Sequence, residues 1–109
     1  ISSVCGLMGL ANQVGYAASK SGMIGLTRAM AVELGKYNIT VNAIAPGYIL
    51  TELTNEGSGG FHYFKSRTVS DRVGIPDDLH GAVLLLASDA SSYISGAVIP
   101  VDGGITANI

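Results

Sequence analysis

Residues 14–46 read VGYAASKSGMIGLTRAMAVELGKYNITVNAIAP, and this stretch decides the fold. Its first part, residues 14–37, is dense in Ala, Leu, Met and Val and has no proline, which predicts one long α-helix. The apolar positions fall nearly all round this helix, so we expect it to be buried on more than one face. Residues 39–44 are rich in β-branched side chains and are followed by Pro46 and Gly47, which predicts a strand.

A helix, a short loop and an apolar strand make up the second half of a β-α-β crossover, which favours a parallel sheet with helices on both faces. A second helix is predicted at residues 76–88, opened by a proline and two acids, and a last strand at 97–101. The proline within that strand suggests a sheet edge or the first residue after a bulge. Residues 48–72 lack a clean period, and we interpret them as a lid that holds a short helix at 61–67.

Tyr16 and Lys20 stand four residues apart in the predicted helix, so both side chains lie on one face, one turn apart. A positive charge close to a phenol favours the phenolate and lowers its pKa. A tyrosine tuned in this way can give a proton to a carbonyl oxygen or take one from an alcohol. The same spacing also occurs in ordinary surface pairs, and the motifs around it therefore decide its meaning.

The composition sets limits on the class of protein. Hydrophobic residues make up 48% and charged residues 13% of 109 residues, which predicts a buried oligomer interface or a piece of a larger domain. The net charge of −2 argues against nucleic acid or an anionic membrane as a partner. A single cysteine, Cys5, leaves no disulfide framework and no zinc cluster. The longest apolar run, residues 82–87, is too short to span a bilayer, and we expect a cytoplasmic location.

The order of the motifs resembles the short-chain dehydrogenase/reductase family along the whole chain. The motifs are Ser2-Ser3, Tyr16-x-x-x-Lys20, NAIAPG at 42–47, Thr51, Arg72-x-Gly74-x-Pro76, Ser95-Gly96 and VDGG at 101–104. The resemblance implies that residues 1–109 are the C-terminal, catalytic portion of a single α/β domain. That domain would be a Rossmann-like, doubly wound parallel sheet.

The resemblance also implies a catalytic set of three residues. Ser3, thirteen residues before Tyr16, takes the position of the family's catalytic serine and would orient the substrate oxygen. Tyr16 would be the general acid/base, while Lys20 would hold the ribose of the nicotinamide and lower the pKa of Tyr16. The implied reaction is hydride transfer between NAD or NADP and a small-molecule alcohol or ketone.

The cofactor-binding residues follow the predicted strand at 39–44. Pro46 and Gly47 turn the chain at its carboxyl end, where ligands bind in open α/β sheets. The resemblance implies that backbone there and at Ile49 meets the nicotinamide carboxamide, and that Thr51 reaches the same part of the cofactor. Tyr16 and Lys20 complete the implied cofactor-binding set.

The family's glycine-rich phosphate turn, its catalytic asparagine and the residue that selects NAD or NADP would precede Ile1. We therefore expect the 109 residues alone to bind a dinucleotide poorly and to be inactive. The long helix at 14–37 predicts an oligomer, because one of its apolar faces would pack on the sheet and another on a second subunit. The resemblance implies a homodimer through this helix, or a homotetramer in which the strand near residues 98–101 builds a second interface.

The lid is most similar to that of the gluconate 5-dehydrogenase branch of the family, although GSGG at 57–60 departs from that branch. A sugar acid such as gluconate or 5-ketogluconate is therefore the expected substrate. The alternative is a 3-oxoacyl-carrier-protein reductase, whose acidic carrier could meet Lys65, Arg67 and Arg72. A non-enzymatic dinucleotide-binding member of the fold is a third hypothesis. It predicts that one or more of Ser3, Tyr16 and Lys20 would be replaced, but all three are present.

Overall fold

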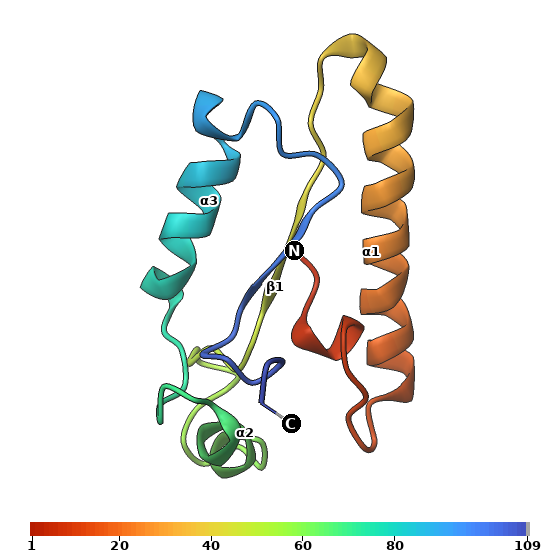
Figure 1. Ribbon diagram of the computed structural model, residues 1–109. Helices are drawn as coiled ribbons and strands as arrows, with labels where there is room; N and C mark the ends of the chain where they lie inside the picture. The colour runs from red at the N-terminus through yellow and green to blue at the C-terminus, as the bar shows by residue number, and fades with distance from the viewer. Residues whose placement is uncertain (109) are drawn as a thin grey trace.

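Two parallel strands run through the centre of the molecule. The structure, a computed structural model, describes residues 1–108. Strands β1 (Ala43–Pro46) and β2 (Val98–Val101) pair in parallel. Helix α1 (Val14–Leu34) lies on one side of them and helix α3 (His80–Leu86) on the other (Figure 1). This is the layered α/β arrangement that the sequence predicts.

The start of the chain lies against β1 on the side away from β2. Ser2 N donates to Ile44 O at 2.8 Å, so the first residues of the chain run beside β1. Within the described residues β2 has a ladder neighbour on one side only. Pro100, opposite Ala45, therefore sits on an edge strand, where its missing N–H costs no ladder bond.

The predicted helix at 14–37 is confirmed with a change of pitch near its end. After α1 the chain tightens into a 3₁₀ turn, η2 (Gly35–Tyr37), and Asn38 then ends the helical run with a left-handed φ of 59°. Ile24 and Thr27 are the buried residues of α1. The rest of the helix surface is more open than its apolar composition predicts.

The first strand differs from its prediction at 39–44, because the structure places it at 43–46. The reason lies in the segment that precedes β2, because residues 94–96 form a turn and are not yet part of the strand. There Val41 N donates to Ser95 Oγ at 3.3 Å, and Gly96 N donates to Val41 O at 2.7 Å. Asn42 bridges to the same segment by donating to Ile94 O at 2.8 Å.

The lid helix α2 (Phe61–Arg67) has the predicted bounds. The predicted helix at 76–88 instead begins as a 3₁₀ turn, η3 (Pro76–Leu79), before α3 follows. Two further 3₁₀ turns are η1 (Val4–Gly6) and η4 (Asp89–Ser91). No helix in the described part of the chain has the length and apolar character needed to cross a membrane.

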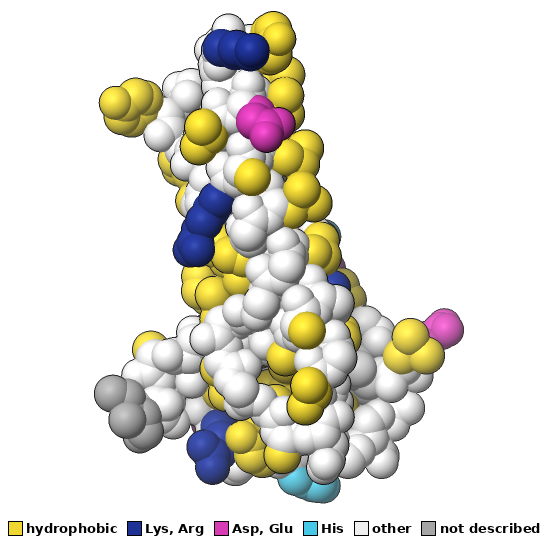
Figure 2. Space-filling view, turned by 90° about the vertical axis from the view of Figure 1, so that its right-hand side faces the viewer, with side chains coloured by type: hydrophobic (Ala, Val, Ile, Leu, Met, Phe, Trp, Pro, Cys, Tyr) yellow, Lys and Arg dark blue, Asp and Glu magenta, His cyan; other side chains and the backbone are white. Residues whose placement is uncertain are grey.

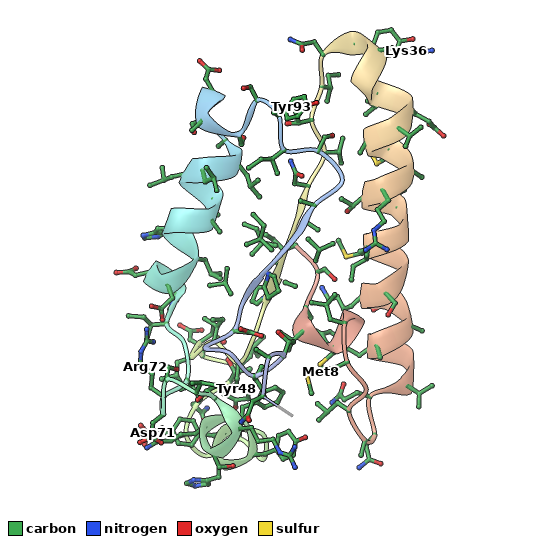
Figure 3. All side chains as sticks on the ribbon, in the orientation of Figure 1. Met8, Lys36, Tyr48, Asp71, Arg72 and Tyr93 are labelled. Atoms are coloured by element: carbon green, nitrogen blue, oxygen red, sulfur yellow. The ribbon has the colours of Figure 1, made fainter. Side chains whose placement is uncertain are left out.

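The largest cluster of buried apolar residues lies near α2, at the carboxyl end of the strands. It joins η1, α2 and the C-terminal turn through Val4, Cys5, Phe61, Phe64, Val73 and Ile105. Tyr48 packs against this cluster, and Figure 3 shows Tyr48, Asp71 and Arg72 at this end, with Lys36 and Tyr93 at the other. The core therefore supports the edge of the sheet where a ligand is expected.

Candidate active site

Tyr16 and Lys20 occupy the first turns of α1 and lie on one face, as their spacing predicts. The Lys20 ammonium is 5.4 Å from the centroid of the Tyr16 ring and donates to Ile1 O at 3.3 Å. An ammonium has three protons, so Lys20 can donate further hydrogen bonds. The Tyr16 side chain is about half exposed, with a relative accessibility of 46%. Its hydroxyl has no hydrogen-bond partner among the described residues.

Ser3 is held at the N-terminus of η1. Its side chain is buried, and its Oγ accepts from Cys5 N at 3.2 Å as an N-cap. Because this bond uses only an oxygen lone pair, the hydroxyl proton of Ser3 stays available for donation. A carbonyl oxygen placed beside Ser3 can therefore receive that proton in a hydrogen bond.

Close packing joins η1 to the turn of α1 that carries Lys20. A Cβ on Gly6 would lie 2.8 Å from the Lys20 carbonyl carbon and 2.9 Å from its oxygen, so only glycine fits there. Ser2 Oγ donates to Lys20 O at 2.8 Å, and Ser21 Oγ donates to Gly6 O at 3.0 Å. These contacts fix the segment that bears Ser3 against the Tyr16–Lys20 turn. The sequence indicates that Gly6 lies in a loop where the chain bends closely, but not that it packs against Lys20.

Pro46 is the last residue of β1, and Gly47 follows it. Ile49 then forms an isolated parallel bridge with Gly74. Leu50 N donates to Gly74 O at 2.8 Å, and Gly74 N donates to Tyr48 O at 2.9 Å. In a parallel pair of this kind the N–H and C=O of Ile49 point away from Gly74. The Ile49 N–H has no hydrogen-bond partner within the described residues.

Thr51 lies on the side to which the Ile49 backbone points. Thr54 Oγ1 donates to Ile49 O, so in the 2.7 Å contact between the two hydroxyls Thr51 is the donor. Thr51 Oγ1 also accepts from Thr54 N at 3.3 Å. One lone pair of Thr51 Oγ1 remains. A primary amide needs a donor for its oxygen and an acceptor for its nitrogen, and Ile49 N–H and Thr51 Oγ1 can supply both.

One open cavity of about 580 Å³ brings together all seven residues that the sequence suggested. Ser3, Tyr16 and Lys20 line it from η1 and α1, and Pro46, Gly47, Ile49 and Thr51 line it from the end of β1. Among the lining residues that the structure describes, Lys20 alone carries a charge, and most others are apolar. No group of three or more His, Cys, Asp or Glu in the described chain could hold a metal ion.

An aromatic wall completes the cavity, and sequence reasoning did not assign it. Tyr48 and Phe64 both line the cavity, and their ring centroids lie 5.2 Å apart. A Cβ on Gly60 would lie 2.8 Å from Tyr48 Cε2, so the lid rests closely on this ring. The aromatic residues at 61–64 were visible in the sequence, but their contact with Tyr48 depends on how the lid folds back.

A second, smaller cavity of about 170 Å³ shares Tyr48 and Ile49 with the first, and its lining includes the shorter of the two ion pairs in the described chain. Arg72 Nη1 and Nη2 donate to the two carboxylate oxygens of Asp78 at 2.7 and 2.8 Å. Hydrogen bonds from Arg72, and then from Ile75 N at 2.8 Å, lower the pKa of Asp78 to about 2. This pair ties the end of the lid to the start of η3.

Comparison with known proteins explains this arrangement. A family model described as enoyl-(acyl carrier protein) reductase matches residues 1–106. The chain belongs to the short-chain dehydrogenase/reductase family. It is 48% identical to the 3-oxoacyl-[acyl-carrier-protein] reductase MabA of Mycobacterium bovis, and the match covers 96% of the chain and 43% of that protein.

Two solved dehydrogenase structures show the same fold. A gluconate 5-dehydrogenase from Burkholderia cenocepacia, in complex with NADP and tartrate, aligns with a TM-score of 0.93 and 34% identity, covering 99% of this chain and 44% of that one. A 4-hydroxyisoleucine dehydrogenase complexed with NADH aligns with a TM-score of 0.91 and 42% identity, covering 99% and 46%. The chain thus spans less than half the length of the relatives it matches.

Proposed function

We propose that the protein containing this chain interconverts a ketone and a secondary alcohol with NADH or NADPH, and that the large cavity is its active site. One observation carries the proposal. A buried serine, a tyrosine with an unpartnered hydroxyl and a lysine beside the tyrosine ring line one cavity. The same cavity has backbone at the end of β1 that can hold a primary amide.

Ser3 and Tyr16 act on the substrate oxygen. In the direction of reduction, Ser3 donates a hydrogen bond to the carbonyl oxygen and orients it. The bound nicotinamide supplies the hydride to the carbonyl carbon. Tyr16 gives its hydroxyl proton to the carbonyl oxygen, so that a neutral alcohol forms and a phenolate remains. The reverse direction returns the proton to Tyr16.

Lys20 stabilises the charge that the reaction leaves on Tyr16. Its ammonium lies 5.4 Å from the ring centroid, so a negative charge left on the Tyr16 oxygen would be attracted to it. Its remaining protons can reach the hydroxyls of the nicotinamide ribose. The Ile49 N–H and the Thr51 hydroxyl would hold the carboxamide of the nicotinamide ring. Pro46 and Gly47 line the same cavity and would form part of the wall against the nicotinamide.

The preferred substrate is a 3-oxoacyl thioester. The curated relative at 48% identity is a reductase of that substrate class. The cavity supports the same choice because Leu10, Leu53 and Phe64 line it and can pack against an acyl chain. A sugar acid would bring a carboxylate, and Lys20 is the one cation that the described lining offers it.

A sugar acid is the second candidate substrate. Its support is the 0.93 TM-score with gluconate 5-dehydrogenase, whose structure contains tartrate, together with the similarity of the lid sequence to that branch. The full-length protein should be assayed with a 3-oxoacyl thioester, with 5-ketogluconate and with gluconate, each with NAD(H) and NADP(H). Turnover of the sugar acids alone would reject the thioester proposal.

Replacement of Tyr16 tests the mechanism for either substrate. Tyr16→Phe keeps the ring but removes the proton donor, so kcat should fall on the order of 10²–10⁴-fold. The Kd for the nicotinamide coenzyme should stay near the wild-type value. Tyr93→Phe is the matched control, because Tyr93 is fully exposed at the opposite end of the molecule (Figure 3). A Tyr16→Phe variant with normal kcat would remove Tyr16 from the mechanism.

A further inference from the structure

The turn that follows β2 is held together by one carboxylate. Asp102 accepts hydrogen bonds from Gly104 N at 2.9 Å, from Thr106 N at 3.0 Å and from the Thr106 hydroxyl. Gly103 and Gly104 have left-handed φ values of 63° and 84°, which L side chains rarely adopt. The carboxylate thus closes a turn whose backbone only glycine adopts without strain.

One side of this turn supports the wall of the large cavity. Gly47 N donates to Val101 O at 3.0 Å. A Cβ on Gly47 would lie 2.8 Å from Asp102 Cα and 3.0 Å from Asp102 Cβ. Because no side chain separates them, the Gly47 backbone rests directly on Asp102. Any shift of Asp102 therefore moves the wall at which the nicotinamide is proposed to bind.

The other side of the turn holds the end of the lid. Gly103 O accepts from Val69 N at 2.8 Å and from Ser70 N at 3.2 Å. A Cβ on Gly103 would lie 2.6 Å from Ser70 Oγ, and one on Gly104 would lie 3.0 Å from Val69 Cγ2. Val69 and Ser70 come just after α2, so the lid returns to the sheet on this turn.

The charge state of Asp102 suits this task. The described ion pairs, Arg72 with Asp78 and His80 with Asp77, do not involve it. Burial raises the pKa of Asp102, but the hydrogen bonds from Thr106 and Gly104 outweigh burial and leave the pKa below its usual value. An ionised carboxylate accepts at both oxygens, one facing Gly104 N and the other facing Thr106. An asparagine has only one oxygen, so its NH₂ group would face one of these donors and lose that hydrogen bond.

We propose that Asp102 is a positioning residue, which fixes the cavity wall at Gly47 and the lid end at Val69 and Ser70 relative to each other. Its carboxylate touches neither substrate nor cofactor in this scheme and acts through the turn. The kinetic effect rests on the proposed function, whereas the contacts do not. Coenzyme binding and the stability of the lid should therefore change together when the turn is altered.

Two substitutions in the full-length protein test this coupling against a matched control. Asp102→Asn loses the carboxylate, and Gly103→Ala places a methyl against Ser70. Gly96→Ala imposes the same left-handed strain, with φ 75°, but in the turn before β2, where its Cβ would make an ordinary 3.6 Å contact with Ala31. All three should lower the Tm. Only the first two should raise the KM for NADPH or NADH, on the order of tenfold.

Hydrogen exchange provides a readout that needs no turnover. In Asp102→Asn and Gly103→Ala, the amides of Val69 and Ser70 should exchange on the order of tenfold faster, because they lose a well-placed acceptor at Gly103 O. In Gly96→Ala they should exchange at the wild-type rate. General destabilisation alone would instead lower the active fraction and kcat in all three variants, with no separate change of KM.

Thr106 offers a test by conservative rescue. Thr106→Val keeps the shape but removes the hydroxyl donor to Asp102, and it should raise the coenzyme KM and the Val69 exchange rate. Thr106→Ser keeps the donor and should restore both. Wild-type KM and exchange in Asp102→Asn would overturn the proposed role of Asp102. Faster exchange in a protein that turns over no ketone or alcohol would keep this role and reject the proposed function instead.

Discussion

At the scale of the residue, Gly6 decides how closely η1 approaches α1. Gly6→Ala would place a Cβ 2.8 Å from the Lys20 carbonyl carbon, which is backbone and cannot move aside cheaply. We predict a loss of stability of about 1–3 kcal/mol from this overpacking. We also predict a fall in kcat, because Ser3 would move away from the Tyr16–Lys20 turn. Urea unfolding and steady-state kinetics of the full-length protein would measure the two effects.

Gly9→Ala is the control for this prediction, because a Cβ on Gly9 would meet nothing within 4 Å. It should leave both stability and kcat close to wild type. If Gly6→Ala and Gly9→Ala behaved alike, then the close approach at Gly6 would have no energetic consequence, and another contact would have to hold η1 in place.

The placement of single residues was predictable where one element carries them. Tyr16 and Lys20 lie on one helix, so their spacing alone predicts a shared face, and the structure confirms it. Ser3 and Gly47 line the same cavity only because separate elements pack together, and the family resemblance rather than spacing indicated their position. Tyr48 was missed as part of the wall, because its role depends on the lid folding back onto it.

At the scale of the element, the ion pair between Arg72 and Asp78 joins the lid to η3. The pKa of Asp78 is lowered to about 2, chiefly by its hydrogen bonds with Arg72. A carboxyl whose folded pKa is depressed stabilises the fold above its unfolded pKa of about 3.9, and this stability is lost as the pH falls toward about 2. We predict that Asp78→Asn destabilises the protein near neutral pH, and that its difference from wild type shrinks in acid.

Urea midpoints at several pH values between neutral and acid would measure this trend. Asp77→Asn removes the same charge from the neighbouring position, which faces His80 Nε2 at 3.9 Å rather than Arg72. Its difference from wild type should not follow the acid trend. A constant difference between Asp78→Asn and wild type at all pH values would show that the ion pair adds no pH-dependent stability.

Helices were easier to predict than strands for a physical reason. The periodicity of α1 and α2 belongs to their own residues, so the long helix and the lid helix were placed with nearly correct bounds. The bounds of β1 depend instead on where β2 begins, and no local pattern contains that information. The change from η3 to α3 was likewise hidden, since a proline and acids suit the start of either helix type.

At the scale of the whole molecule, α1 presents more apolar surface than the described residues cover. Figure 2, which views the side of the molecule formed by α1, shows hydrophobic side chains along the helix. Met23, Leu26 and Met30 recur at helical spacing, and their relative accessibilities are 36%, 57% and 37%. Large exposed apolar patches of this kind mark interaction surfaces.

We expect this face to contact a second copy of the protein, as the all-round apolar pattern of the helix predicts. Leu26→Glu would bury a charge in that contact, and desolvating an unpaired carboxylate costs more than the apolar contact gains. The variant should sediment as a smaller species than the wild-type protein. Glu33→Gln, on the same helix, should leave the assembly unchanged. If Leu26→Glu sedimented like wild type and remained folded, the Leu26 face would lie outside any subunit interface, and the exposed side of α1 opposite it would become the surface to test.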